Sequence, residues 1–133
     1  MYYYLEIDAP PQTTEHTPIR ETIKLSRGVL EFIDIGFPTW NARLGRCRIY
    51  YNSIMIIPFN RASWLSGHDT TLRIPLSLNL DADPFEITIE VNNLDDTYSH
   101  ELSFGLSMKY TEIDNLTFRQ DYLMVADTTQ EQA

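Results

Sequence analysis

Residues 71–80 read TLRIPLSLNL, a run in which an apolar side chain stands at every second position. Successive side chains of a β-strand point to opposite faces of its sheet, so this spacing predicts a strand with one packed face and one wet face. The apolar face holds Leu72, Ile74, Leu76, Leu78 and Leu80. Pro75 cannot donate a backbone hydrogen bond to a neighbouring strand, so the strand can break there.

The same alternation recurs in residues 85–91 and 102–108, and with more noise in the N-terminal half. Asn52 and Ser53 suit the tight turn of a hairpin. No segment keeps a 3.6-residue period over a helical length, although residues 61–66 fit one short helical turn. The patterns predict about eight strands, at residues 2–7, 20–26, 29–36, 43–51, 54–58, 70–80, 85–92 and 100–110. The predicted fold class is all-β, a single-domain jelly roll or a related antiparallel β-sandwich.

The domain organisation follows from the same patterns. A chain of 133 residues fits one domain of ordinary size. The predicted sandwich core spans residues 20–111. Residues 1–19 combine a first strand with a Pro-rich stretch, 8–18, that is typical of a linker or an arm. Residues 112–133 form a C-terminal extension that begins with apolar side chains and ends in polar residues expected to be disordered.

The net charge of −9 argues against a general nucleic-acid binder, because contacts to phosphates need clustered Lys and Arg. The charge is uneven along the chain. Residues 20–73 hold eight cations and four acids, whereas residues 81–133 hold twelve acids and two cations. Two oppositely charged surfaces could join neighbouring subunits head to tail, unless the two halves interleave in the fold and the contrast vanishes.

The sequence gives no sign of secretion or of membrane insertion. Its first six residues, MYYYLE, lack the basic region of a signal peptide, and its longest apolar stretch, residues 54–59, is too short to span a bilayer. We therefore expect synthesis in a cytoplasm and no membrane insertion. Cys47 is the only cysteine, which excludes an intrachain disulfide, and we expect it to be a small buried apolar side chain rather than a reactive thiol.

No constellation in the sequence predicts catalysis, a cofactor or a metal site, and we expect the protein not to be an enzyme. Ser99, His100 and Asp96 are near neighbours on a strand or turn, so their side chains point in different directions and do not make a triad. His68 and His100 match no zinc spacing. Loop carboxylates can hold calcium, but Asp is also a good turn former, and we prefer the turn interpretation. The carboxylates concerned are Asp81, Asp83, Asp95 and Asp96.

Aromatic and basic side chains in loops or on polar faces are the candidates for interface or ligand contacts. They are Trp40, Arg46, Arg48, Tyr98, Phe118 and Tyr122. Loop aromatics bury a large area at low entropy cost, which suits a protein- or sugar-binding surface. Trp40 fits either such a surface or a plug at the end of the sandwich, whereas Trp64 is expected to be a plug. Arg43, Arg46 and Arg48 could form a basic strip near Tyr50 and Tyr51, but for Arg46 and Arg48 ordinary solvated charge is the default interpretation.

Several short motifs of the middle of the chain carry a resemblance to a known family. They are IKLSRGVL at residues 23–30, Phe37-Pro38, RIY at 48–50, PFN at 58–60, WLSG at 64–67 and NNLDDTYSH at 92–100. Over residues 20–110 the chain resembles short proteins encoded by viruses and proviruses of bacteria and archaea. The resemblance implies a small virion component, such as a capsid-vertex, decoration or tail-associated protein, with terminal arms that tie subunits together. It implies no catalytic residues.

The leading expectation is therefore a virion structural protein that forms a homo-oligomer and contacts other virion proteins. It would be made in the host cytoplasm, reside in the virion, and contact no nucleic acid. The alternative is a β-sandwich module that binds a carbohydrate or a host receptor through loop aromatics such as Trp40 and Tyr98. In one form of this alternative, calcium sits at Asp95 and Asp96.

Overall fold

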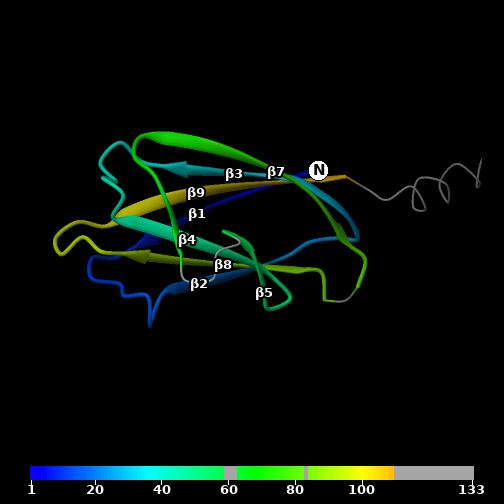
Figure 1. The fold of residues 1–133 in the computed structure, drawn as a ribbon, viewed down its shortest axis with the longest axis horizontal. Coiled ribbons are helices and arrows are strands. Elements are labelled where there is room, and N and C mark those ends of the chain that lie inside the picture. The colour runs from blue at the N-terminus through cyan, green and yellow to red at the C-terminus, as the bar shows by residue number, and fades with distance from the viewer. Residues whose placement is uncertain (59–62, 83, 110–133) are drawn as a thin grey trace, which may run out of the picture.

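The computed structural model describes residues 1–58, 63–82 and 84–109, and these residues form nine β-strands (Figure 1). The strands are β1 (Tyr2–Ala9), β2 (Ile19–Lys24), β3 (Gly28–Phe37), β4 (Gly45–Tyr51), β5 (Ile54–Ile57), β6 (Leu65–Ser66), β7 (Thr70–Leu80), β8 (Glu86–Asn93) and β9 (His100–Lys109). The all-β prediction is confirmed, and every predicted strand has a counterpart. The short β6 was not predicted.

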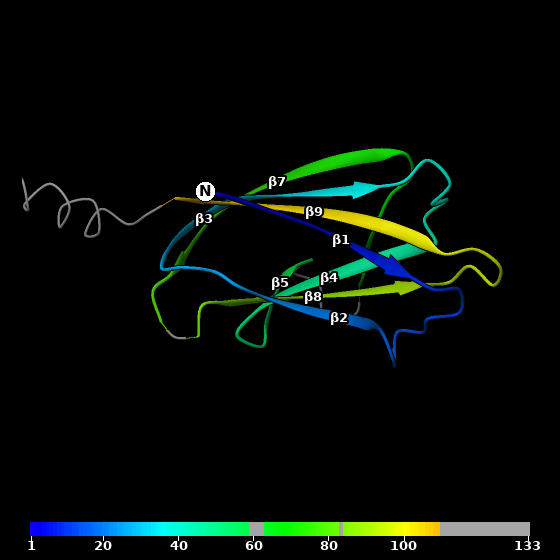
Figure 2. The same cartoon turned by 180° about the vertical axis from the view of Figure 1, so that it is seen from behind.

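The strands form two sheets that face each other (Figures 1 and 2). One sheet has the order β1-β9-β3-β7, and the other has the order β2-β8-β4-β5 with β6 beside β4. The antiparallel pairs are nested in the sequence. The innermost pair is β4–β5, followed outward by β3–β7, β2–β8 and finally β1–β9. Successive pairs alternate between the sheets, as in one long hairpin rolled around a core. This is the arrangement of a jelly roll.

The core lies between the two sheets, which each contribute every second side chain. Its fully buried members include Leu30, Ile33, Ile35, Cys47, Ile49, Ile87, Ile89, Val91, Leu102, Phe104 and Leu106. Burial of one such Leu, Ile or Phe side chain contributes about 1.5–3 kcal/mol to folding. Burial also raises the pKa of the Cys47 thiol, so the prediction of a small buried side chain at this position is confirmed.

β7 runs through Pro75 without the break that the sequence allowed. In the described part of the chain β7 is an edge strand with β3 as its one neighbour, and proline is tolerated where no neighbouring strand needs its missing N–H. The register shifts near Pro75, where two residues of β7 stand opposite Glu31 of β3. One of the two, Ser77, has a φ of 77°, a left-handed conformation that some types of β-bulge adopt at one residue.

The β4–β5 hairpin turns at Asn52 and Ser53, as predicted. Their φ values are 48° and 75°, the left-handed conformation of the tight turns that join twisted strands. The helical turn expected at residues 61–66 is wrong for the part that the structure describes. Leu65 and Ser66 form β6 and pair with Cys47 and Arg46 of β4, because an extended segment can hydrogen-bond to the edge of β4.

The Pro-rich stretch after β1 links the two sheets of the sandwich. β1 extends to Ala9, which is fully buried, and the chain then crosses to β2. The N–H of Gln12 donates to the carbonyl of Asp95 (2.8 Å), and the N–H of Asn93 donates to the carbonyl of Thr13 (3.0 Å). Of the two predicted roles, linker and arm, these contacts fit the linker.

The charge contrast along the sequence is interleaved in space over the described residues. The acidic β8 lies between β2 and β4, which carry arginines on the same outer face. Glu90 of β8 pairs with Arg20 of β2 and also accepts from the hydroxyl of Tyr50 on β4 (3.3 Å). The two halves therefore do not make separate charged surfaces here.

Candidate binding pocket at one end of the sandwich

An open pocket of about 560 Å³ lies at the end of the sandwich where the β3–β4 and β8–β9 loops meet (left in Figure 1). Its lining consists of Trp40, Asp95, Tyr98, Ser99 and His100. Trp40 comes from the β3–β4 loop and the others from the β8–β9 loop and the start of β9. The fold thus brings together two segments more than 50 residues apart in the chain.

The β3–β4 loop exposes the ring of Trp40 while its own backbone is fixed. Trp40 is 84 % exposed, whereas the next residue, Asn41, is fully buried. The Asn41 amide donates to the carbonyls of Gly45 (3.0 Å) and Gly67 (2.7 Å), and its Oδ1 accepts from the N–H of Gly45 (2.9 Å). The N–H of Ala42 donates to Nδ1 of His68 (3.0 Å). Buried hydrogen bonds of this kind hold the loop in one shape.

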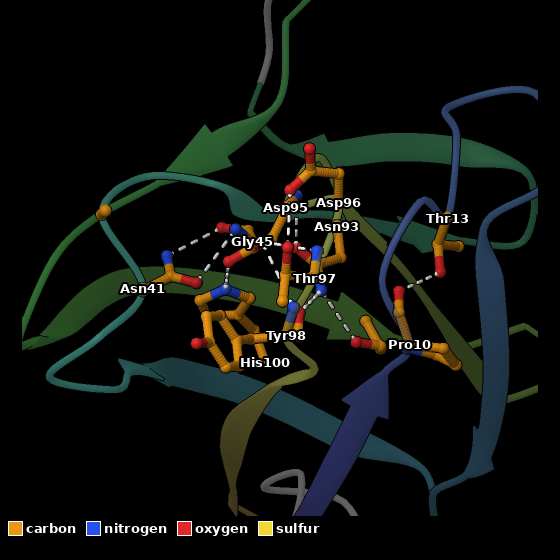
Figure 3. Close-up of polar contacts among 12 residues, drawn as sticks. Pro10, Thr13, Asn41, Gly45, Asn93, Asp95, Asp96, Thr97, Tyr98 and His100 are labelled. Atoms are coloured by element: carbon orange, nitrogen blue, oxygen red, sulfur yellow. Dashed lines mark hydrogen bonds and ion pairs between the residues drawn. The ribbon is translucent and has the colours of Figure 1, made fainter.

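The β8–β9 loop is held from inside by Asn93 and Asp95 (Figure 3). The Asn93 amide donates to the carbonyl of Tyr98 (2.8 Å), and its Oδ1 accepts from the N–H of Asp95 (2.9 Å). Oδ1 of Asp95 accepts from the N–H groups of Thr97 (2.9 Å) and Tyr98 (3.2 Å), as in an Asx turn. The ring of Tyr98 is nevertheless 70 % exposed. Here too the backbone is fixed and the aromatic ring is open to solvent.

His100 and Asp95 form the most buried polar pair of the pocket. His100 is 3 % exposed, and its Nε2 lies 2.9 Å from Oδ2 of Asp95. The hydrogen bond from His100 lowers the pKa of the Asp95 carboxyl, and the N–H groups of Thr97 and Tyr98 act in the same direction. The pair ties the loop to the first residue of β9. Asp96, the acid considered with His100 in the sequence, instead accepts from the hydroxyl of Thr97 (2.9 Å).

The structure separates the six predicted contact residues into three places. Trp40 and Tyr98 share the pocket, and the exposure of Trp40 rules out its role as a plug. Arg46 and Arg48 lie on β4, on the outer face of the five-stranded sheet. Phe118 and Tyr122 lie outside the described residues.

Arg46 and Arg48 are engaged by neighbours on their own sheet. Their guanidinium carbons lie 5.4 and 4.1 Å from the ring centroid of Trp64, in cation–π contact. Arg46 also donates to Asn92 (3.1 Å) and lies 3.7 Å from the carboxylate of Glu15. Desolvation lowers the pKa of Arg46, while Glu15 opposes that shift. The prediction that Trp64 plugs the sandwich is wrong, because its ring lies against these arginines on the polar face.

Two of the aspartates considered for calcium, Asp95 and Asp96, act as turn residues. Asp95 and Asp96 satisfy N–H and hydroxyl groups of their own loop, as described above. Within residues 1–58, 63–82 and 84–109, no three His, Cys, Asp or Glu side chains gather in a way that could hold a metal ion. Asp83 lies outside the described residues.

Sequence reasoning did not find the residues that shape the pocket. Asn41, Asn93 and the pairing of Asp95 with His100 were all missed. In a sequence, Asn and Asp in a loop indicate a turn, but they do not show which distant backbone groups they bind. The exposed aromatics were found because tryptophan and tyrosine in loops are uncommon enough to be noticed.

Compared with known proteins, the chain matches no family model, no curated protein and no solved structure. Among the residues that the structure describes, no helix has the length and apolar character needed to cross a membrane.

Proposed function

We propose that this protein is a structural subunit of a virion that self-assembles and contacts neighbouring virion proteins. The observation that carries the proposal is the nested strand order of the jelly roll, an architecture common in capsid proteins and in lectins. The sequence resemblance to virus-encoded proteins supplies the viral setting. In this proposal the protein is made in the host cytoplasm and resides in the virion.

The outer face of the four-stranded sheet offers a surface for assembly with a second copy. The residues of β9 on this face are small, namely Ser103, Gly105 and Ser107. Tyr2 and Tyr4 on the neighbouring β1 are 51 % and 60 % exposed. Tyrosines beside a flat sheet supply contact area at low entropy cost, and tyrosine is enriched in protein interfaces.

Tyr2 lies across this face and is held there. Its hydroxyl donates to Asp34 of β3 (3.0 Å), and Asp34 in turn accepts from Arg73 of β7 (2.8 Å). Arg73 also lies 4.0 Å from the ring centroid of Phe32. A face whose side chains are already ordered loses little entropy when a second copy packs on it.

The experiment is the solution mass of the full chain by light scattering, at low and high salt. We expect a discrete oligomer, and we expect the double variant Tyr2→Ala with Tyr4→Ala to shift the mass toward the monomer. Thr22→Ala, on the outer face of the other sheet, is the matched control and should leave the mass unchanged. A monomer at every concentration would overturn the proposal of self-assembly. If the double variant keeps the oligomer mass of the wild type, the interface lies elsewhere and the choice of this face is overturned.

A further inference from the structure

Trp40 and Tyr98 are the two most exposed large hydrophobic or aromatic side chains of the described residues, and both line one pocket. Exposed apolar side chains scattered singly over a surface need no explanation. Here the two largest exposures converge on one pocket from two loops. Since neither ring is covered by the described part of the fold, both are available for contact with a ligand at this end of the molecule.

The loops that carry the two rings are ordered before any ligand arrives. Buried Asn41 fixes the backbone beside Trp40, and Asn93 with Asp95 fixes the backbone of Tyr98 (Figure 3). Burying a polar side chain is unfavourable unless its hydrogen bonds are made, and both asparagines make theirs to loop backbone. Rigid presentation of exposed rings lowers the entropy that binding would cost. The hydrogen bonds of the two loops therefore hold the rings of Trp40 and Tyr98 in place for a ligand, in addition to stabilising the fold.

The polar groups of the pocket stand beside the rings. Oδ1 of Asp95 accepts two backbone N–H groups, whereas among the described residues Oδ2 accepts from His100 alone, and a carboxylate oxygen with one partner can take a further hydrogen bond. Ser99, which carries a hydroxyl group, is exposed and lines the same pocket. The pocket thus offers aromatic faces together with a fixed carboxylate acceptor and a hydroxyl.

We infer that this pocket binds a neutral pyranose sugar. One face of a pyranose carries only C–H bonds and packs on an aromatic ring, while its rim carries hydroxyl groups that need polar partners. Trp40 and Tyr98 supply aromatic rings for the C–H face of the sugar, and Asp95 and Ser99 supply polar partners for its hydroxyl groups. A volume of about 560 Å³ is in the range of small-molecule sites. The Asp95 carboxylate and the net charge of −9 favour a neutral sugar over an acidic one.

This site is independent of the assembly surface proposed above. The pocket lies at the loop end beside His100, whereas Tyr2 pairs with Ser107 near the opposite end of β9. A subunit built in this way can assemble through its sheet face and present sugar-binding loops outward. Sugar recognition at the loops also goes beyond a purely structural role for the subunit.

The experiment measures binding of four methyl pyranosides to the full chain by saturation-transfer NMR and calorimetry. The probes are the methyl glycosides of glucose, galactose, mannose and N-acetylglucosamine. We expect at least one to bind with a dissociation constant on the order of 1 mM, as is usual for a small ligand in one open pocket. Trp40→Ala should weaken binding at least tenfold. Because Trp40 is 84 % exposed, that variant should melt at the wild-type temperature.

Ile54→Ala is the control, because Ile54 is 67 % exposed at the other end of the sandwich and should not affect sugar binding. Absence of binding by all four sugars, or binding unchanged in Trp40→Ala, would overturn the inference. Tighter binding of tetramethylammonium than of any sugar would also overturn it, because the rings would then form a cage for a cation. The oligomer mass of the same samples is measured in parallel. Assembly without sugar binding would refute this inference alone, and sugar binding by a monomer would refute only the proposal of assembly.

Discussion

Nε2 of His100 lies 2.9 Å from Oδ2 of Asp95, and this contact joins the β8–β9 loop to the first residue of β9. The two residues are five positions apart, so the pair closes a short loop. The same carboxylate caps the loop backbone through its other oxygen. The conformation of Tyr98 therefore depends on the ionised form of Asp95, which is the form that accepts all three hydrogen bonds.

Acid should loosen this loop. The pKa of Asp95 in the folded protein is below its ordinary value of about 3.9, first because of His100 and then because of the Thr97 N–H. A depressed carboxyl pKa contributes stability above the unfolded pKa, and this stability is lost as pH falls through the folded pKa. We expect the melting temperature to fall below about pH 4, and Asp95→Asn to show a smaller acid-induced fall.

The measurement is a thermal melt followed by circular dichroism between pH 7 and pH 2. Asp96→Asn is the matched control, since the Asp96 carboxylate accepts an exposed hydrogen bond from the neighbouring Thr97 hydroxyl and the variant should keep the wild-type acid response. An acid response in Asp95→Asn equal to that of the wild type would show that other carboxyls set the stability.

Asn41→Ala should be strongly destabilising for a loop residue. The change removes three hydrogen bonds and leaves backbone groups of Gly45 and Gly67 buried without those partners. A buried polar group that loses its partner costs about 1–3 kcal/mol, so we expect a loss of roughly 2–3 kcal/mol in the free energy of unfolding. Urea denaturation measures it. Asn79→Ala, at an exposed position of β7, should change stability by less than about 0.5 kcal/mol. Equal effects at the two sites would contradict the role given to Asn41.

The strands were predictable because their pattern is local. Alternation in residues 71–80, 85–91 and 102–108 needs only neighbouring positions, and the structure keeps all three as strands. The order of strands in the sheets was not predictable beyond the class of sandwich, because pairing such as β1 with β9 joins residues about 100 positions apart. β6 was missed because two residues are too few to show any period.

The site was only partly predictable for a related reason. Trp40 and Tyr98 were identified by residue type, but no sequence pattern shows that the rolled hairpin brings their loops together. Trp64 was misassigned because its neighbour Leu65 is apolar. The pairing of β6 with β4 instead sets its ring against Arg48, and that contact depends on sheet register rather than on flanking residues.

Alanine at two glycines should have unequal effects on stability. A Cβ at Gly45 would lie 2.4 Å from Oδ1 of Asn41 and 3.0 Å from Cδ1 of Leu102, both of which are buried. A Cβ at Gly105 would lie 1.8 Å from the hydroxyl oxygen of Tyr2, the far end of a half-exposed side chain that can move aside if it gives up its exposed hydrogen bond to Asp34. We expect Gly45→Ala to cost about 2 kcal/mol or more, and Gly105→Ala less than about 1 kcal/mol.

Urea denaturation of both variants measures these costs, and a double-mutant cycle tests the cause. In a Tyr2→Ala background the Gly105→Ala cost should disappear, because the clashing atoms are gone. An unchanged cost in that background would mean that Gly105 is needed for a reason other than the Tyr2 ring.

Deletion of residues 112–133 should leave the jelly roll folded and weaken assembly. The nine strands of the described residues end at Lys109, at the opposite end of the sandwich from the pocket. The core described above consists of residues between Ile7 and Met108, so we expect the urea midpoint of the truncated chain to match that of the full chain. The mass by light scattering should shift toward the monomer if the extension ties subunits together. Deletion of residues 127–133 alone is the control and should change neither measurement. A truncated chain that unfolds would show instead that Phe118 and Tyr122 belong to the core of the same subunit.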